Sequence, residues 1–217
     1  MIYLYALTGP LQVSPQGTGL DGAPLEVATV DDLVAVYSSH EHLAPRADRD
    51  SCWAHDQAVE VVMRSQTVLP ARFGTTFRDM KELRAAVGRH ALALSRRLRE
   101  LDGCVELAVR IGPLTSGNRP PGDGRDYLVG KLAVHRQREA LAEGTLACLK
   151  EFAVASKPAA QARRGETVSI SYLVRAGEVE RFARAVGRLA RRWPEFSLSC
   201  TGPWAPYSFA TTSTGAI

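Results

Sequence analysis

Thr201-Gly202-Pro203-Trp204-Ala205-Pro206-Tyr207-Ser208-Phe209 is the stretch around which the whole chain can be interpreted. It follows residues 196–201, in which apolar and small polar side chains alternate strictly, as they do in a half-buried strand. Gly202-Pro203 is predicted to end that strand, because proline cannot donate a hydrogen bond to a neighbouring strand. The sequence therefore predicts a final strand followed by a short, stiff tail.

The tail carries the aromatic side chains Trp204, Tyr207 and Phe209. Such rings bury about 150–250 Å² each, so they are rarely left in water without a function. Two interpretations are open: the rings fill the bottom of the core, or they form a surface that is shared with a partner protein. These three residues are the candidate partner-binding residues.

Short strand patterns open the chain. Residues 2–7 are apolar on both faces of the predicted strand, which is typical of a central position in a sheet. Residues 25–30 and 33–37 are rich in β-branched side chains and are predicted to form a hairpin around Asp31-Asp32.

Two helices are predicted next. The first is capped by Ser51, carries Trp53 in its apolar spacing and is ended by Pro70. The second begins at Asp79, with Glu82 completing a capping-box pattern, and its apolar stripe marks one long helix.

The second half alternates strand and helix patterns. Its strands and helices are predicted in the order strand, helix, strand, helix, strand, over residues 105–111, 126–153, 168–174, 179–193 and 196–201. Loops are predicted over residues 115–126 and 157–166. Helices that cover one face of a small sheet make an α+β sandwich, and this order resembles a ferredoxin-like unit with one strand missing or displaced.

The predicted fold class is α+β with two lobes. A chain of 217 residues with 45% hydrophobic and 23% charged residues is long enough for one large or two small cores. Residues 1–101 are expected to form a small, strand-rich α+β lobe with its connecting helix. Residues 102–217 are expected to form a modified ferredoxin-like α/β sandwich.

Composition narrows the function classes. The net charge of +4 is spread along the chain, no apolar run approaches the roughly 20 residues of a membrane span, and no leader pattern opens the sequence. We therefore expect a cytoplasmic protein with no membrane or nucleic-acid partner. The four cysteines are far apart, which favours reduced thiols; they are Cys52, Cys104, Cys148 and Cys200.

Two partial matches to ligand-binding motifs occur, but the surrounding sequence does not fit either site. His40-x-His42 followed by Cys52-x-x-His55 is short of a zinc-finger pattern, and His55 is also explained as helix surface. The Gly-x-Gly-x-x-Gly match over residues 17–22 precedes strand-like sequence, where a dinucleotide site needs a helix N-terminus. We therefore predict no catalytic, cofactor-binding or metal-binding residues, no cofactor and no enzyme.

Arginines gather on two predicted helices. They are Arg84, Arg89, Arg96, Arg97 and Arg99 on the first, and Arg181, Arg184, Arg188, Arg191 and Arg192 on the last. Two interpretations are open, a solvated face or a docking surface for an acidic partner. Nucleic acid is disfavoured, because no aromatic residues lie between these arginines to stack on bases.

Arg72 has a different setting, between Pro70 and Phe73 in a predicted turn. A guanidinium in such a turn can bind nearby backbone carbonyls and stack on a ring. Arg72 and Phe73 are therefore predicted to form a structural latch that joins the two lobes.

Four segments together resemble a known family. They are Ile2-Tyr3-Leu4-Tyr5-Ala6, Val68-Leu69-Pro70-Ala71-Arg72-Phe73-Gly74-Thr75-Thr76-Phe77, Val105-Glu106-Leu107-Ala108-Val109-Arg110, and the C-terminal stretch quoted above. In this order they resemble the signatures of the GvpL/GvpF family of gas vesicle proteins.

The resemblance implies a function that involves no catalysis. It implies a non-enzymatic accessory or minor structural protein of gas vesicles, which binds the small hydrophobic shell protein, limits its aggregation and assists vesicle nucleation and assembly. The implied partners are that shell protein and other gas vesicle accessory proteins, and the implied location is the gas vesicle. Two alternatives stay open on the fold alone, a ferredoxin-like regulatory module and an RNA-binding module.

Overall fold

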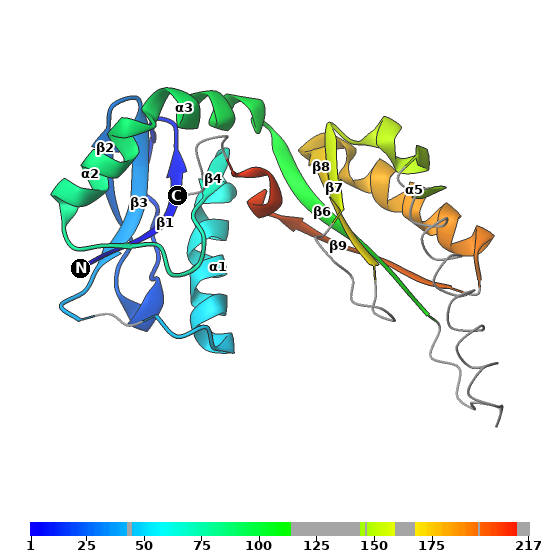
Figure 1. The fold of residues 1–217 in the computed structure, drawn as a ribbon, viewed down its shortest axis with the longest axis horizontal. Coiled ribbons are helices and arrows are strands. Elements are labelled where there is room, and N and C mark those ends of the chain that lie inside the picture. The colour runs from blue at the N-terminus through cyan, green and yellow to red at the C-terminus, as the bar shows by residue number, and fades with distance from the viewer. Residues whose placement is uncertain (43–44, 114–143, 146, 159–167, 195, 212–217) are drawn as a thin grey trace, which may run out of the picture. The chain divides into compact units, whose positions relative to one another are not determined.

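The computed structural model describes residues 1–42, 45–113, 144–145, 147–158, 168–194 and 196–211 (Figure 1). Residues Met1–Cys104 and those from Trp204 onward form one compact unit, and Val105–Pro203 form a second. The expected division between residues 101 and 102 lies close to the first crossing between these units. The expected second lobe also included the C-terminal tail, which groups with the first unit instead. The α+β class is confirmed.

The first unit is built on a sheet whose central strand is β1 (Ile2–Thr8). On one side β1 pairs antiparallel with β3 (Leu33–Ser39), and β2 (Glu26–Val30) pairs with the far edge of β3. On the other side β1 pairs with β4 (Val68–Pro70) and then with β5 (Thr76–Phe77). All residues of β1 are buried, so the predicted central position is confirmed.

A β-bulge in β1 interrupts the regular alternation of its side chains between the two faces of the sheet. Tyr3, Tyr5 and Ala6 all join the core cluster that includes residues of the first helix, although Tyr5 and Ala6 are neighbours in sequence. Leu4 and Leu7 line a pocket on the other side of the strand. The extra residue in β1 thus places two adjacent side chains on one face.

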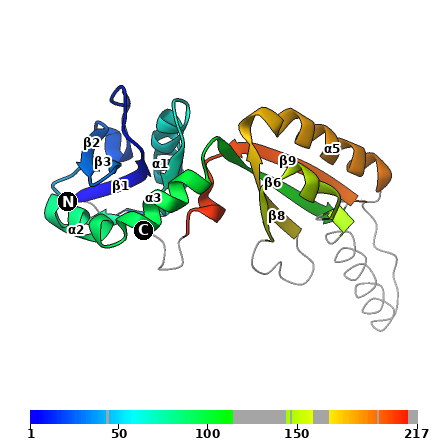
Figure 2. The same ribbon diagram turned by 90° about the horizontal axis from the view of Figure 1, so that it is seen from above.

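Helices cover both faces of this sheet, α1 on one and the pair α2 and α3 on the other (Figure 2). They span Arg49–Met63, Met80–Arg89 and Ala91–Glu100, and the 3₁₀ turn η1 spans Leu20–Gly22. The predicted cap at Asp79 is confirmed, since its carboxylate accepts a hydrogen bond of 2.8 Å from the Glu82 amide. The predicted single long helix is wrong, because His90 breaks it with φ −120° and ψ 10°.

Three expectations for α1 are wrong. Its N-cap is Asp48, whose side chain accepts a hydrogen bond from the amide of Ser51, the residue predicted to be the cap. Trp53 lies on the outer face and is 64% exposed. The helix ends at Met63, and the residues before Pro70 form β4 instead, because β1 offers them an edge to pair with.

The second unit is a four-stranded sheet in the order β7-β8-β6-β9. The strands span Cys104–Pro113 (β6), Ala155–Pro158 (β7), Val168–Arg175 (β8) and Phe196–Trp204 (β9). The helix α5 covers Val179–Arg192, after the 3₁₀ turn η3 (Ala176–Glu178), and η2 (Lys150–Phe152) precedes β7.

Strand β7 completes a ferredoxin-like order. It pairs antiparallel with β8, and the chain runs β6, the helical residues 144–145 and 147–149, β7, β8, α5 and β9. The order was predicted with one strand missing or displaced. That strand is present as β7, and only its residues 157 and 158 fall in the loop predicted from residue 157. The predicted loop over 115–126 and the helix from 126 to 143 lie outside the described residues.

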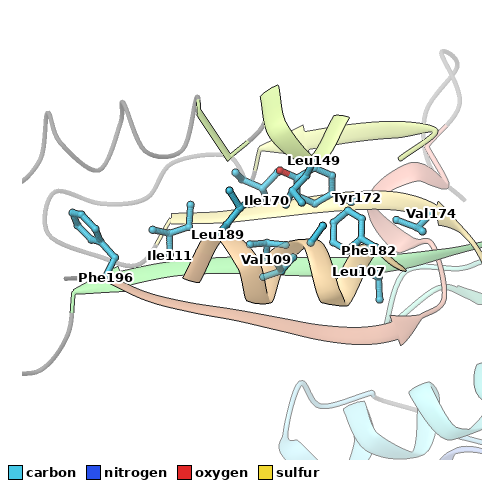
Figure 3. Close-up of a cluster of buried hydrophobic side chains, with 12 residues drawn as sticks. Leu107, Val109, Ile111, Leu149, Ile170, Tyr172, Val174, Phe182, Leu189 and Phe196 are labelled. Atoms are coloured by element: carbon cyan, nitrogen blue, oxygen red, sulfur yellow. The ribbon is translucent and has the colours of Figure 1, made fainter. Parts of the chain in front are cut away.

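One hydrophobic cluster fills the space between α5 and this sheet (Figure 3). Alternate residues of β6 and β8 point toward the helix, as their period-two pattern predicts. The fully buried members with the largest side chains are Tyr172 and Phe182.

The last strand continues through Gly202-Pro203, so the predicted end at that dipeptide is wrong. Because β9 is an end strand of the sheet, a proline without an N–H is tolerated there. The 3₁₀ turn η4 (Tyr207–Phe209) follows. Across the described part of the chain, no helix combines the length and the apolar character needed to cross a bilayer.

Candidate functional site

Three segments that are far apart in the sequence meet around the imidazole of His55 on α1. The rings of Tyr3 and Tyr5 lie 5.6 Å from it, that of Phe73 5.7 Å and that of Tyr207 6.1 Å, between centroids. His55 is only 1% exposed. We call these five residues the His55 cluster. It joins β1, the turn after β4 and the C-terminal tail.

The Tyr3 hydroxyl links the Gly74 amide to the imidazole of His55. The Tyr3 hydroxyl accepts from the amide of Gly74 at 2.9 Å and lies 3.0 Å from Nδ1 of His55. The other ring nitrogen of His55 is Nε2. That nitrogen is buried, and no group among the described residues meets hydrogen-bond geometry with it.

Burial controls the charge of the His55 cluster. It lowers the pKa of His55, although the Asp56 carboxylate and the Ala71 backbone favour the protonated ring. Burial also raises the pKa of Tyr3 to about 12 and raises that of Tyr207 further. The cluster is thus neutral near pH 7 and suits packing better than acid–base chemistry.

A second buried polar chain lies beside this cluster. The Tyr5 hydroxyl accepts from the Leu20 amide at 2.8 Å and lies 2.8 Å from the Ser38 hydroxyl. Ser38 in turn lies 2.7 Å from Nε2 of His40. Gly19 makes room for this arrangement, because a Cβ there would lie 1.8 Å from the Tyr5 oxygen. The glycine-rich segment therefore packs against a tyrosine.

Two of the three predicted partner-binding residues hold the tail against the rest of the first unit. Phe209 is buried at 4% exposure, and the half-buried Tyr207 donates a hydrogen bond of 2.9 Å to Oδ1 of Asp56. Trp204 is 53% exposed. Of the three predicted residues, Trp204 alone offers a largely free ring, and a partner-binding role for them stays a prediction.

A pocket of 260 Å³ lies between the tail and the sheet. Its floor is formed by apolar side chains of β1, β4 and α3. The tail contributes Tyr207, Ser208, Ala210 and Thr211 to its wall, and Arg72 lies at its side. We call this the tail pocket.

Arg72 and Phe73 have different surroundings. Thr75 donates from its amide (3.1 Å) and its hydroxyl (2.7 Å) to the carbonyl of Arg72, so the predicted turn is confirmed. Phe73 packs against Tyr3 and His55 within the first unit. The Arg72 side chain is exposed, and within the described chain its guanidinium makes no hydrogen bond or ion pair. A latch between the lobes stays a prediction.

The weak metal pattern is not assembled. His55 faces the aromatic rings, and His40 binds Ser38. Among the residues that the structure describes, no three His, Cys, Asp or Glu side chains gather as a ligand set. None of the four cysteines forms a disulfide.

Several of the helix arginines pair with acidic residues one turn away. The ion pairs are Arg96–Glu100, Arg97–Glu100, Arg181–Glu178 and Arg184–Glu180, at 2.7–3.5 Å. Arg181 also lies over the ring of Phe152, 5.2 Å from its centroid. These pairs reduce the positive charge that an acidic partner or a nucleic acid would meet.

His55 and Asp56 are the site residues that sequence reasoning missed. The expectation of His55 on the helix surface is wrong. Its spacing to Ala58, Val59 and Val62 is the i, i+3, i+4, i+7 pattern of one buried helix face, and all four are buried. That pattern was the available signal. Nothing in the sequence marks Asp56 as the partner of a tyrosine 151 residues away.

Comparison with known proteins matches nearly the whole chain. The family model of the gas vesicle synthesis protein GvpL/GvpF matches residues 1–114 and 129–211. Gas vesicle protein F1 of Halobacterium salinarum is 26% identical over 220 residues, covering 99% of this chain and 95% of that protein. Gas vesicle protein L of a Streptomyces species is 28% identical, covering 96% and 92%.

Two crystal structures share the fold. The gas vesicle protein GvpF from an Anabaena species has a TM-score of 0.83 at 18% identity, covering 100% of this chain and 98% of that one. GvpF from Microcystis aeruginosa has a TM-score of 0.80, also at 18% identity, covering 97% and 98%.

Proposed function

The chain belongs to the GvpL/GvpF family of gas vesicle synthesis proteins, and from this membership we propose a non-enzymatic accessory role in which it shields apolar surface on the vesicle shell protein. Membership supports a role in gas vesicle formation and association with gas vesicles. In the proposed role, the protein binds the small hydrophobic shell protein, limits its aggregation and assists the nucleation of vesicles.

Shielding has a simple physical basis. A shell subunit that repels water on one side exposes a large apolar patch before assembly, and such patches associate indiscriminately. A folded protein with an exposed apolar surface of its own can cover that patch reversibly. Other gas vesicle accessory proteins are further candidate partners.

The observation that carries the proposal is the exposed ring of Trp204 on an anchored tail. The next residue, Ala205, is buried at 6% exposure, and Tyr207 and Phe209 hold the following turn. Because the residues that follow Trp204 are anchored, this part of the backbone loses little conformational freedom when the ring binds, which favours affinity. Tryptophan is also among the side chains that dominate binding energies.

Co-purification with the shell protein tests this. Trp204→Ala is expected to weaken binding roughly thirtyfold, the equivalent of about 2 kcal/mol for a central tryptophan. Trp53→Ala is the matched control, since Trp53 is also exposed in the first unit but lies on α1. Circular dichroism would confirm that both variants fold. Unchanged binding by Trp204→Ala would remove the tail from the interface.

A further inference from the structure

The floor of the tail pocket is apolar and fully formed. Leu4, Leu7 and Leu94 line it, and each is 2% exposed or less. The volume of 260 Å³ is several times the roughly 30 Å³ that one water molecule occupies in the liquid. It is large enough for one bulky aliphatic side chain and part of its neighbour.

The side of the pocket carries the guanidinium of Arg72. In the described part of this unit Arg64, Arg78, Arg96 and Arg97 pair with glutamates, whereas Arg72 has no such partner. None of the described residues that line the pocket is acidic. A guanidinium that no described residue pairs, beside a hollow whose described lining is largely apolar and holds no acidic side chain, is complementary to a carboxylate next to an apolar group.

The wall formed by the tail is held in place from two directions. Tyr207 is bound to Asp56, and the carbonyl of Thr211 accepts a hydrogen bond of 3.2 Å from Nη2 of Arg97. The pocket therefore exists before any ligand arrives. Binding to a preformed pocket avoids the cost of ordering the wall.

We propose that the tail pocket binds a short segment of a partner protein in which a bulky aliphatic residue stands next to an aspartate or glutamate. The aliphatic side chain would enter the leucine-lined floor, and the carboxylate would pair with Arg72. The inference rests on the proposed function, in which this unit binds a partner protein. It adds which kind of segment of that partner enters the pocket.

Peptide binding to the full chain tests the proposal without a vesicle protein. The probe is acetyl-Ser-Leu-Glu-Ser-amide, compared with versions that carry Gln for Glu or Ser for Leu, and titrated by NMR chemical shifts. We expect the parent peptide to bind and either change to weaken it roughly tenfold. Arg72→Gln should abolish the preference for Glu over Gln, and Ala210→Leu should block binding by filling the pocket.

Arg89→Gln is the matched control, since Arg89 is an exposed arginine on α2 that does not line the pocket, and it should bind like the wild type. Equal affinity for the Glu and Gln peptides would overturn the proposal. So would equally tight binding of free 4-methylpentanoate, which would indicate a small-molecule site. A lower melting temperature of Arg72→Gln with unchanged peptide binding would also overturn it and would return Arg72 to a structural role.

The two proposals fail separately. If the peptides do not bind while Trp204→Ala still reduces capture of the shell protein, the pocket proposal is wrong and the shielding role stands. If the peptides bind as expected and Trp204→Ala has no effect on capture, the pocket proposal is supported and the tail ring is removed from the shell interface.

Discussion

Tyr207 donates its phenol proton to Oδ1 of Asp56 across 2.9 Å, and this hydrogen bond joins two residues 151 positions apart. It ties the C-terminal tail to α1, directly beside the buried imidazole of His55. Everything proposed for the tail depends on this anchoring, because it holds the exposed Trp204 and one wall of the tail pocket.

Removing this hydrogen bond should loosen the tail measurably. Tyr207→Phe keeps the ring but loses the donor, at a cost of about 1 kcal/mol. For a chain of this size we expect the melting temperature to fall by roughly 2–4 °C, measured by circular dichroism. Asp56→Asn, which keeps an acceptor oxygen, should lose less. A melting temperature for Tyr207→Phe equal to that of the wild type would show that the bond does not hold the tail.

Gly19→Ala should destabilise the first unit. The added methyl group would lie 1.8 Å from the Tyr5 oxygen, and the buried ring has no space to retreat. Overpacking of this kind costs about 1–3 kcal/mol. Gly17→Ala is the control, since its Cβ would be 3.5 Å from Leu25, an ordinary contact. Urea denaturation compares the two, and equal midpoints would contradict the packing described here.

His55 should make the first unit less stable in acid. Burial lowers its pKa in the folded state, whereas the unfolded chain titrates near 6.5. Below that pH the unfolded state binds more protons, so the free energy of unfolding falls as pH falls, by at most about 1.4 kcal/mol per pH unit for one group. Burial also lowers the pKa of His40, which adds in the same direction.

The variant His55→Phe isolates this contribution. The slope of stability between pH 7 and pH 5, from urea denaturation at each pH, should become shallower than in the wild type. His42→Gln, a change at an exposed histidine, should keep the wild-type slope. An equal slope in His55→Phe and the wild type would mean that His55 titrates alike in the folded and unfolded chains.

The start of α1 offers a direct test of the helix cap. Asp48→Ala removes the carboxylate that accepts the hydrogen bond of 2.8 Å from the Ser51 amide, so the melting temperature should fall by roughly 2–4 °C. Ser51→Ala keeps the amide that donates this bond and should have a smaller effect. The reverse order would restore Ser51 as the cap.

Most local elements could be predicted, because their signals are local. Alternation over β8, the apolar stripe of α5 and the carboxylate of Asp79 each specify an element from neighbouring residues. Some of the errors fall where a distant partner overrides the local signal. Residues 68–70 follow a helix and precede a turn, yet they form a strand because the edge of β1 is available.

The candidate site was predictable only in part. The tail and the turn around Phe73 could be singled out by their residues, and their resemblance to the GvpL/GvpF signatures is confirmed by the family match. Their convergence on His55 could not be predicted, since no local pattern states which ring meets which histidine. The same holds for the division of the tail into an exposed Trp204 and a buried Phe209.

The sequence by itself determined the class of fold, the family and the existence of most strands and helices, because periodicity, turn residues and caps act over a few positions. Only the tertiary structure decided that Trp53 faces outward, that β9 continues through Gly202-Pro203, and that the tail groups with the first unit. Side-chain burial and strand pairing depend on contacts between segments about 50 to 150 residues apart. Short-range spacing in the sequence does not identify those partners.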